Sequence, residues 1–142
     1  MERTDRNVDD FLAELPEAAR EDMVVLDRTI AAVMSGHPRV LYTGTFWGGS
    51  AQEIIGYGEL TNQRPGKPDV EWFIVGLALQ KAYISLYISA VEERQYLSEK
   101  YGHELGKVKV GKSSISFKRV ADIDLDGLAA LVTRAREITE AG

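Results

Sequence analysis

The sequence predicts a single α+β domain in which a small, mostly antiparallel sheet of about four strands is backed by N-terminal, middle and C-terminal helices. Three observations support this fold class. Apolar residues recur with the helical period near both ends of the chain, and they alternate with period two in its centre. No linker, internal repeat or low-complexity tract divides the 142 residues, a length typical of one domain. Residues 1–142 are therefore expected to fold together.

Two amphipathic helices are expected at the N-terminus. Asn7 is a suitable N-cap for the first helix, in which Phe11 and Leu12 lie on one apolar face. Pro16 interrupts that pattern and favours the start of a second helix. The apolar stripe of this second helix ends before Gly36, which is a typical stop signal.

The centre of the chain is predicted to form strands. Residues 40–50 mix glycine with bulky aromatic side chains, so this segment is expected to be irregular or only briefly helical. A strand is expected over 53–60, followed by a polar turn over 61–69. The apolar run 71–79 and the alternating segment 83–89 are separated by three residues and are typical of a β-hairpin.

The last third of the chain completes the fold. A helix is expected over about 92–101, a strand over 113–120 and a final helix from Asp124 onward. Side chains alternate between the two faces of a strand. If the aliphatic side chains of 83–89 and 113–120 pack on helices, the tyrosines, serines and Lys118 lie on the opposite face.

Charge and composition exclude several classes of function. The net charge of −5 arises within residues 1–30, which hold nine acids and four bases, and the remainder holds thirteen of each. A mildly acidic chain is a poor general binder of nucleic acid, because affinity for the backbone comes from phosphate neutralisation. The absence of cysteine excludes disulfides, thiolate chemistry and cysteine-bound metals.

No apolar run approaches the ~20 residues of a membrane helix, and the charged N-terminus is unlike a signal peptide. A cytoplasmic location without membrane contact is therefore expected.

Residues 106–113 match the spacing of a P-loop, GxxxxGK[ST]. A P-loop leaves a strand and opens a helix, whose N-terminal amides hold phosphates. Here a helix is expected before the motif and a strand after it. We therefore interpret the segment as a basic connection whose Lys107, Lys109, Lys112 and Ser113 can hold a phosphate or carboxylate without nucleotide hydrolysis.

Residues 122–127 imitate the start of a calcium-binding EF-hand loop, but Thr133 occupies the twelfth position, where a bidentate glutamate is required. Asp124 is explained as a helix cap instead. The two histidines, His37 and His103, show no metal-binding spacing.

The order of several motifs resembles the YdhG-like family, whose members mostly have no assigned activity. These motifs are the opening Val8–Pro16, the tyrosine–glycine segment Ile54–Gly58, the hairpin Phe73–Tyr87 and the C-terminal stretch Gly111–Asp124. The resemblance covers roughly residues 7–138 and implies an α+β fold with an antiparallel sheet backed by helices.

This chain departs from the family pattern at two places. Glu59 stands where methionine and proline often follow the tyrosine–glycine pair, and Thr43–Gly49 form a glycine- and tryptophan-rich insert. Some bacterial members of the family are regarded as frataxin-like intracellular iron chaperones. Iron is therefore expected as a cofactor only on the basis of this resemblance.

Three functions remain open. The first is non-catalytic binding of a small anionic or aromatic ligand, or of a protein partner, on the sheet face opposite the helices. Aromatic rings beside hydroxyls and lysines are typical of ligand pockets. The candidate ligand-binding residues are Tyr57, Trp72, Tyr83, Tyr87, Lys112, Ser114 and Lys118. A second copy of the chain is also a candidate partner, with a homodimer formed through this face or the Trp47 region.

The second function is that of an iron chaperone. Asp10 and Glu14, and likewise Glu17 and Glu21, are spaced four residues apart and would share a helix face. Their hard oxygen ligands suit weak, exchangeable iron.

The third function is an enzyme in which Tyr57, Tyr83 or Lys81 performs acid–base chemistry. The sequence favours the first function, that of a binding protein.

Overall fold

The computed structural model of the chain describes residues 2–45, 51–64 and 66–141. Its centre is a seven-stranded antiparallel sheet with the strand order β1-β2-β3-β6-β7-β11-β10. In chain order, its strands are β1 (Glu2–Arg3), β2 (Arg39–Thr45), β3 (Ala51–Tyr57), β6 (Val75–Leu79), β7 (Ile84–Ile88), β10 (Lys109–Val110) and β11 (Ser114–Phe117).

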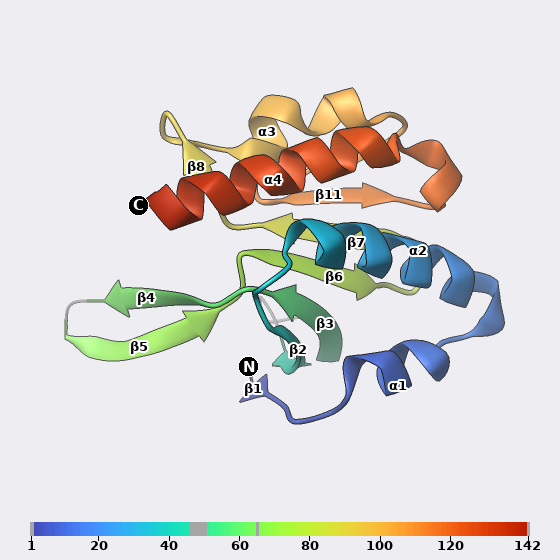
Figure 1. Cartoon of the computed structure of the whole chain (residues 1–142), viewed down its shortest axis with the longest axis horizontal. Helices are drawn as coiled ribbons and strands as arrows, with labels where there is room; N and C mark the ends of the chain where they lie inside the picture. The colour runs from blue at the N-terminus through green and yellow to red at the C-terminus, as the bar shows by residue number, and fades with distance from the viewer. Residues whose placement is uncertain (1, 46–50, 65, 142) are drawn as a thin grey trace.

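Two short hairpins stand outside this sheet, β4 (Leu60–Arg64) with β5 (Lys67–Trp72), and β8 (Val91–Glu92) with β9 (Gln95–Tyr96). The β4–β5 hairpin extends away from the body of the molecule (Figure 1).

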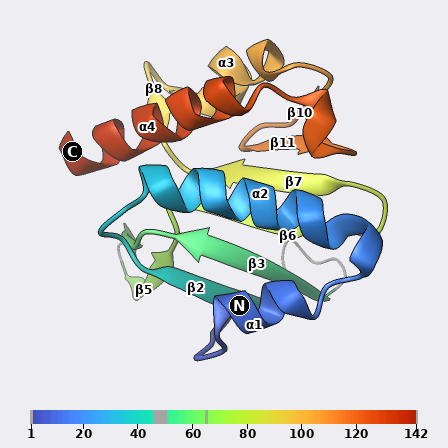
Figure 2. The ribbon, with the colours of Figure 1, turned by 45° about the vertical axis from the view of Figure 1, so that its right-hand side comes forward.

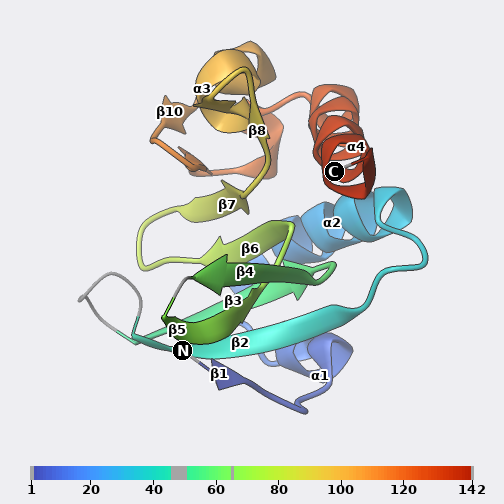
Figure 3. The ribbon, with the colours of Figure 1, turned by 90° about the vertical axis from the view of Figure 1, so that its left-hand side faces the viewer.

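Helices cover one face of the sheet. They are α1 (Val8–Ala13), α2 (Glu17–Val33), α3 (Leu97–Tyr101) and α4 (Leu125–Ala141), with 3₁₀ turns η1 (Gly102–Leu105) and η2 (Val120–Asp122). Figures 1 and 2 show α1, α2 and α4 in front of the strands, and the view in Figure 3 places all three on one side of the sheet. None of the described helices is long and apolar enough to cross a membrane.

The main core lies between these helices and the sheet. The inward positions of neighbouring strands, such as Leu41, Leu77 and Leu86, are fully buried against Leu26 of α2 and Val132 of α4. The expected aliphatic face is confirmed, because its members all belong to this core. They are Ile84, Leu86, Ile88, Ile115 and Phe117.

The expected number of strands was too small. Residues 40–50 were predicted to be irregular or only briefly helical, but residues 40–45 belong to β2, which pairs with β3 along its whole length. Residues 46–50 lie outside the described part of the chain. Val40 and Tyr42 pack on one side of the sheet and Leu41 on the other, so both faces of β2 are buried. A strand buried on both faces lacks the apolar–polar alternation that identifies a strand in a sequence.

Two other segments differ from the prediction. The polar turn expected over 61–69 is the end of the β4–β5 hairpin. The helix expected from about residue 92 begins only at Leu97, because the preceding residues form the β8–β9 hairpin. Its two turn residues, Glu93 and Arg94, both have positive φ, 53° and 68°, as the tight type I′ turn requires.

Buried or partly buried carboxylates join distant elements. Asp22 of α2 accepts hydrogen bonds from the Arg119 side chain and the Val120 amide, which lie before and in η2. The Arg119 hydrogen bond is the main reason why the pKa of Asp22 is lowered. Glu92 of β8 accepts hydrogen bonds from Lys100, Tyr101 and Arg134, and these lower its pKa to about 2.

A smaller apolar cluster lies on the face opposite the helices. Its buried members are Val40, Tyr42, Ile54, Phe73 and Ala78, with Trp72 and Tyr87 packed against them. Gly56 and Gly76 are directly paired in the sheet. A Cβ atom at Gly56 would lie 2.9 Å from Phe73 and one at Gly76 2.6 Å from it, so the two glycines make room for the Phe73 side chain.

Candidate functional site

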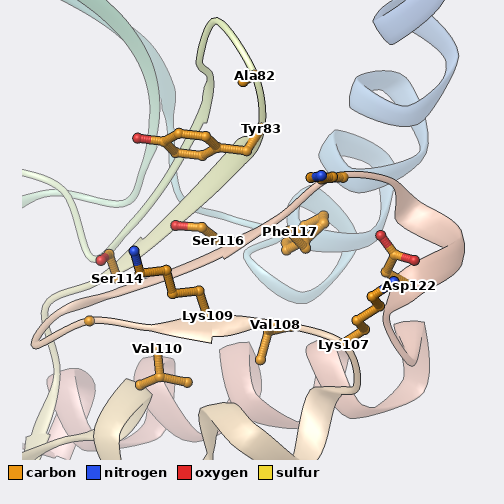
Figure 4. A pocket seen from close by; sticks show the side chains of 12 residues that line it. Ala82, Tyr83, Lys107, Val108, Lys109, Val110, Ser114, Ser116, Phe117 and Asp122 are labelled. Atoms are coloured by element: carbon orange, nitrogen blue, oxygen red, sulfur yellow. The ribbon is translucent and has the colours of Figure 1, made fainter.

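The sheet face opposite the helices holds a concave site at the end that carries the β6–β7 turn. This site, here called the basic depression, has a volume of about 490 Å³. Its polar and aromatic lining residues are Tyr83, Lys107, Lys109, Ser114, Ser116 and Lys118. In Figure 4, Ser114 and Ser116 project from the sheet beside Tyr83, and the Lys109 side chain extends toward Ser114.

Strand alternation explains how these side chains come together. In β11, Ile115 and Phe117 point into the main core, so Ser114 and Ser116 face the opposite side. Lys109 of β10 is the register partner of Ser116, which places its backbone directly beside the serines.

The approach to β10 requires a glycine. Gly106 has a φ of 132°, and a Cβ atom there would lie 2.4 Å from the Asp122 carbonyl oxygen. The Lys107 amide donates to that same oxygen at 2.9 Å. The segment that carries the lysines is thereby fixed against the residues that precede α4.

The lysines of the basic depression have no acidic partner within the described residues, because none of Lys107, Lys109 and Lys118 forms an ion pair there. Asp122 also lines the depression, but its carboxylate accepts a hydrogen bond from the Arg119 amide. Three lysines and one carboxylate therefore line the depression and leave it with an excess of positive charge, an arrangement that suits an anion.

A second concave site lies on the same side of the sheet, between the base of the β4–β5 hairpin and the β8–β9 hairpin. This site, here called the aromatic pocket, has a volume of about 450 Å³. Its lining residues are Leu60, Trp72, Phe73, Tyr87, Ile88, Ser89, Val91, Tyr96 and Ser113. The Trp72 and Phe73 rings are stacked at 4.3 Å between centroids, with 26° between their planes.

Tyr87 is held by polar contacts at its hydroxyl. The Gln80 side-chain amide donates to the Tyr87 hydroxyl oxygen at 3.2 Å and to the side-chain amide oxygen of Gln52 at 3.0 Å. Burial raises the pKa of Tyr87, and hydrogen bonds with Ser85 and Gln80 act in the opposite direction.

The structure divides the predicted ligand-binding residues between these two sites. Tyr83, Ser114 and Lys118 line the basic depression, and Trp72 and Tyr87 line the aromatic pocket. Lys112 is exposed in the turn between β10 and β11, outside the lining of both sites. Its backbone carbonyl accepts a hydrogen bond from the Ser98 hydroxyl.

Tyr57 does not lie on this face, which corrects the placement expected for it. Its side chain is fully buried in the main core, and its hydroxyl donates to Asp27 of α2 at 2.7 Å. Arg39 donates to the same carboxylate at 2.8 Å and to Asp9 of α1 at 3.0 Å. Burial raises the pKa of Tyr57 well above its ordinary value. Tyr57 is therefore part of the contact between α2 and the sheet.

Sequence reasoning missed Phe73 and Tyr96 of the aromatic pocket. The signal for Phe73 was the glycine in each of the two neighbouring strands, Gly56 and Gly76, since glycine within a strand often marks a close approach by another group. Tyr96 fell within a segment predicted to be helical, so its place in the lining of the same pocket as Tyr87 was not foreseeable.

The candidate metal ligands do not form a cluster with other donors. Asp10, Glu14, Glu17 and Glu21 are all exposed, and Glu14 lies 3.6 Å from the Arg6 guanidinium. Within residues 2–45, 51–64 and 66–141, no group of three or more histidine, aspartate or glutamate side chains is arranged to hold a metal ion.

The remaining acid–base candidates, Lys81 and Tyr83, are both exposed at the β6–β7 turn. The Trp47 region, named as a possible dimer contact, lies outside the described residues.

Comparison with the sequence models of known families, with curated proteins and with solved structures found no match. Function is therefore inferred from the geometry of the two sites.

Proposed function

We propose that this chain is a non-catalytic, cytoplasmic binding protein of the YdhG-like type that binds a small anionic ligand in the basic depression. The observation that carries the proposal is the convergence of Lys107, Lys109 and Lys118 on one hollow without an ion-pair partner among the described residues.

The dimensions and lining of the depression support a small ligand. Its volume of about 490 Å³ falls within the ~300–1,000 Å³ of small-molecule sites. Hydrogen bonds from ammonium groups to a phosphate or carboxylate are about twice as strong as neutral ones. Ser114 and Ser116 supply hydroxyls that donate to an anion, and the Tyr83 ring supplies an apolar wall.

The overall architecture supports the YdhG-like assignment, because an antiparallel sheet backed by helices is the fold that the resemblance implies. The iron-chaperone and enzyme alternatives gain no such support. The four acidic candidates stand outside any donor cluster among the described residues, and Tyr57 is buried in the core.

The test is a titration with inorganic phosphate, tripolyphosphate and citrate, in which binding is measured by calorimetry and by the shift in thermal unfolding. A ligand that binds only the folded state raises its free energy of unfolding by about 2.7 kcal/mol at a concentration 100 times its Kd. The variant Lys109→Ala/Lys118→Ala should lose most of the affinity. Binding should also weaken with added salt, because the lysines are exposed to solvent.

Lys112→Ala is the matched control, since it removes one lysine from the same basic run but outside the depression. The proposal fails if no anion binds, or if Lys112→Ala weakens binding as much as the double variant does.

A further inference from the structure

We infer that the ligand carries a planar aromatic ring as well as its anionic group, and that this ring occupies the aromatic pocket while the anion occupies the basic depression. The inference rests on the proposed function and deepens it, because it names the chemical class of the ligand.

The lining of the aromatic pocket suits a flat, uncharged group. Rings from three separate segments line it, namely Trp72 of β5, Tyr87 of β7 and Tyr96 of β9. Among the described residues that line it, none has a charged side chain. A ring prefers to stack on, or meet edge-on, another ring, and the described lining has no cation to neutralise the anionic part of a ligand.

The position of the Trp72 ring is fixed by two neighbouring rings. Phe73 supports one face of its indole, and Tyr42 meets it edge-on with 6.0 Å between ring centroids. Phe73 is in turn fixed above the paired glycines of β3 and β6. Trp72 is half-buried and is part of the lining of the aromatic pocket. A preorganised contact costs little entropy when the ligand binds.

The two sites are close enough for one ligand. Tyr83, which immediately precedes β7, lines the basic depression, and Tyr87 of β7 lines the aromatic pocket four residues later. Four residues along a strand span roughly 13 Å.

The gap between the two sites is narrower than that span. Tyr87 is the register partner of Ser114, which lines the basic depression. The Tyr87 hydroxyl also reaches Gln80, at the β6–β7 end of the sheet. A ligand whose ring and anion are on the order of 10 Å apart therefore reaches both sites.

Two kinds of compound share this chemistry, a nucleotide and an arylalkyl phosphate. Both present a flat ring at one end and a negatively charged group at the other, separated by a spacer. The spacer of the nucleotide is a ribose with further phosphates and that of the arylalkyl phosphate is a plain carbon chain, so the two are distinguished by comparing ATP with 4-phenylbutyl phosphate.

The experiment measures the Kd of tripolyphosphate, inorganic phosphate, ATP and 4-phenylbutyl phosphate by calorimetry, for the parent chain and for each variant. One stacked ring is expected to make ATP bind at least about tenfold tighter than tripolyphosphate, or 4-phenylbutyl phosphate at least about tenfold tighter than inorganic phosphate. Trp72→Ala should abolish this difference without changing the Kd of tripolyphosphate. Tyr96→Ala, on a different hairpin and outside the Phe73 cluster, tests the same pocket if Trp72→Ala fails to fold.

A direct readout of position comes from fluorescence. In a Trp47→Phe background, Trp72 is the remaining tryptophan, and the ring-bearing ligand should quench its emission at the same concentration at which heat is released. Arg94→Ala is the control, since Arg94 lies in the turn of the Tyr96 hairpin but does not line the pocket.

The outcomes separate the two proposals. If ATP, 4-phenylbutyl phosphate or both gain affinity through Trp72 and Tyr96, the inference is supported and the preferred compound identifies the ligand class. If tripolyphosphate binds through Lys109 and Lys118 but neither ring adds affinity, the inference is overturned and the proposed function stands. If no probe binds, both are overturned.

Discussion

The hydrogen bond between Tyr57 and Asp27 should be a main contributor to the attachment of α2 to the sheet, and Tyr57→Phe tests this directly. The hydroxyl donates to Asp27 at 2.7 Å, and both residues are buried, with 0% of Tyr57 and 7% of Asp27 exposed. Removing the hydroxyl leaves the ring in place but deprives one carboxylate oxygen of its donor. Arg39 continues to donate to the other oxygen.

The expected cost follows from the charge of the acceptor. Hydrogen bonds to charged groups contribute about 1.5–3 kcal/mol, so Tyr57→Phe should lower the free energy of unfolding by about 2 kcal/mol. In a chain of this size that change lowers the Tm by roughly 4–8 °C. Urea denaturation followed by circular dichroism measures the free energy, and Tyr83→Phe, at a 44% exposed position, is the control with an expected change below about 0.5 kcal/mol.

The same residue should give a pH signature. Burial raises the pKa of Tyr57 above its ordinary value of 10.0, so the folded chain favours the neutral phenol. Its contribution to stability is therefore complete below pH 10 and is lost as the pH rises beyond 10. Tyr57→Phe should reduce this alkaline loss relative to the parent chain. The reasoning is refuted if Tyr57→Phe is as stable as the parent within about 0.5 kcal/mol and the alkaline loss is unchanged.

Three further predictions concern other parts of the chain. Glu92, whose pKa is lowered to about 2 by its three donors, contributes stability above pH 4.5 that is lost as the pH falls toward 2. Glu92→Gln should therefore reduce the difference in Tm between pH 6 and pH 3, and an unchanged difference would contradict this role. Gly76→Ala places a Cβ atom 2.6 Å from the Phe73 ring and should cost about 1–3 kcal/mol in urea unfolding, as overpacking does; an unaffected variant would show that Phe73 is free to move. Replacing Glu93 and Arg94 with Asn-Gly suits the positive φ at both positions and should raise the free energy of unfolding by about 1 kcal/mol, whereas Ala-Ala should not.

The sequence predicted the elements whose pattern is strong. The N-terminal cap is an example, since the Asn7 side chain accepts from the Asp10 amide as its position suggested. The β6–β7 hairpin and the final helix were also foreseen within a few residues. In these elements one face is apolar and the other polar, so periodicity alone identifies them.

The elements that were missed lack this contrast. β1 and β10 contain two residues each, too few to show any period. The Glu93–Arg94 turn contains neither glycine nor asparagine, the usual signals of a type I′ turn. Whether these short segments form strands depends on the strands with which they pair, and a single sequence does not reveal which segments will pair.

Most of the candidate ligand-binding residues were expected on one face of the sheet, but their division between two concave sites was not expected. Tyr83, Ser114 and Lys118 were placed together by strand alternation, which holds in the structure. Tyr57 was misplaced because its carboxylate partner Asp27 lies 30 residues away in the chain. A tyrosine that is bonded to a helix and one that faces solvent look the same in a strand pattern.

The two edges of the large sheet have a consequence for how the protein behaves at high concentration. β1 and β10 are two-residue strands that occupy these edges, and Thr4 extends the cover of β2 through two hydrogen bonds to the Leu41 carbonyl. A long bare edge strand is a template for pairing with another chain. Deleting residues 1–6 would expose the unpaired edge of β2. We therefore expect the shortened chain to self-associate by pairing of exposed β2 edges.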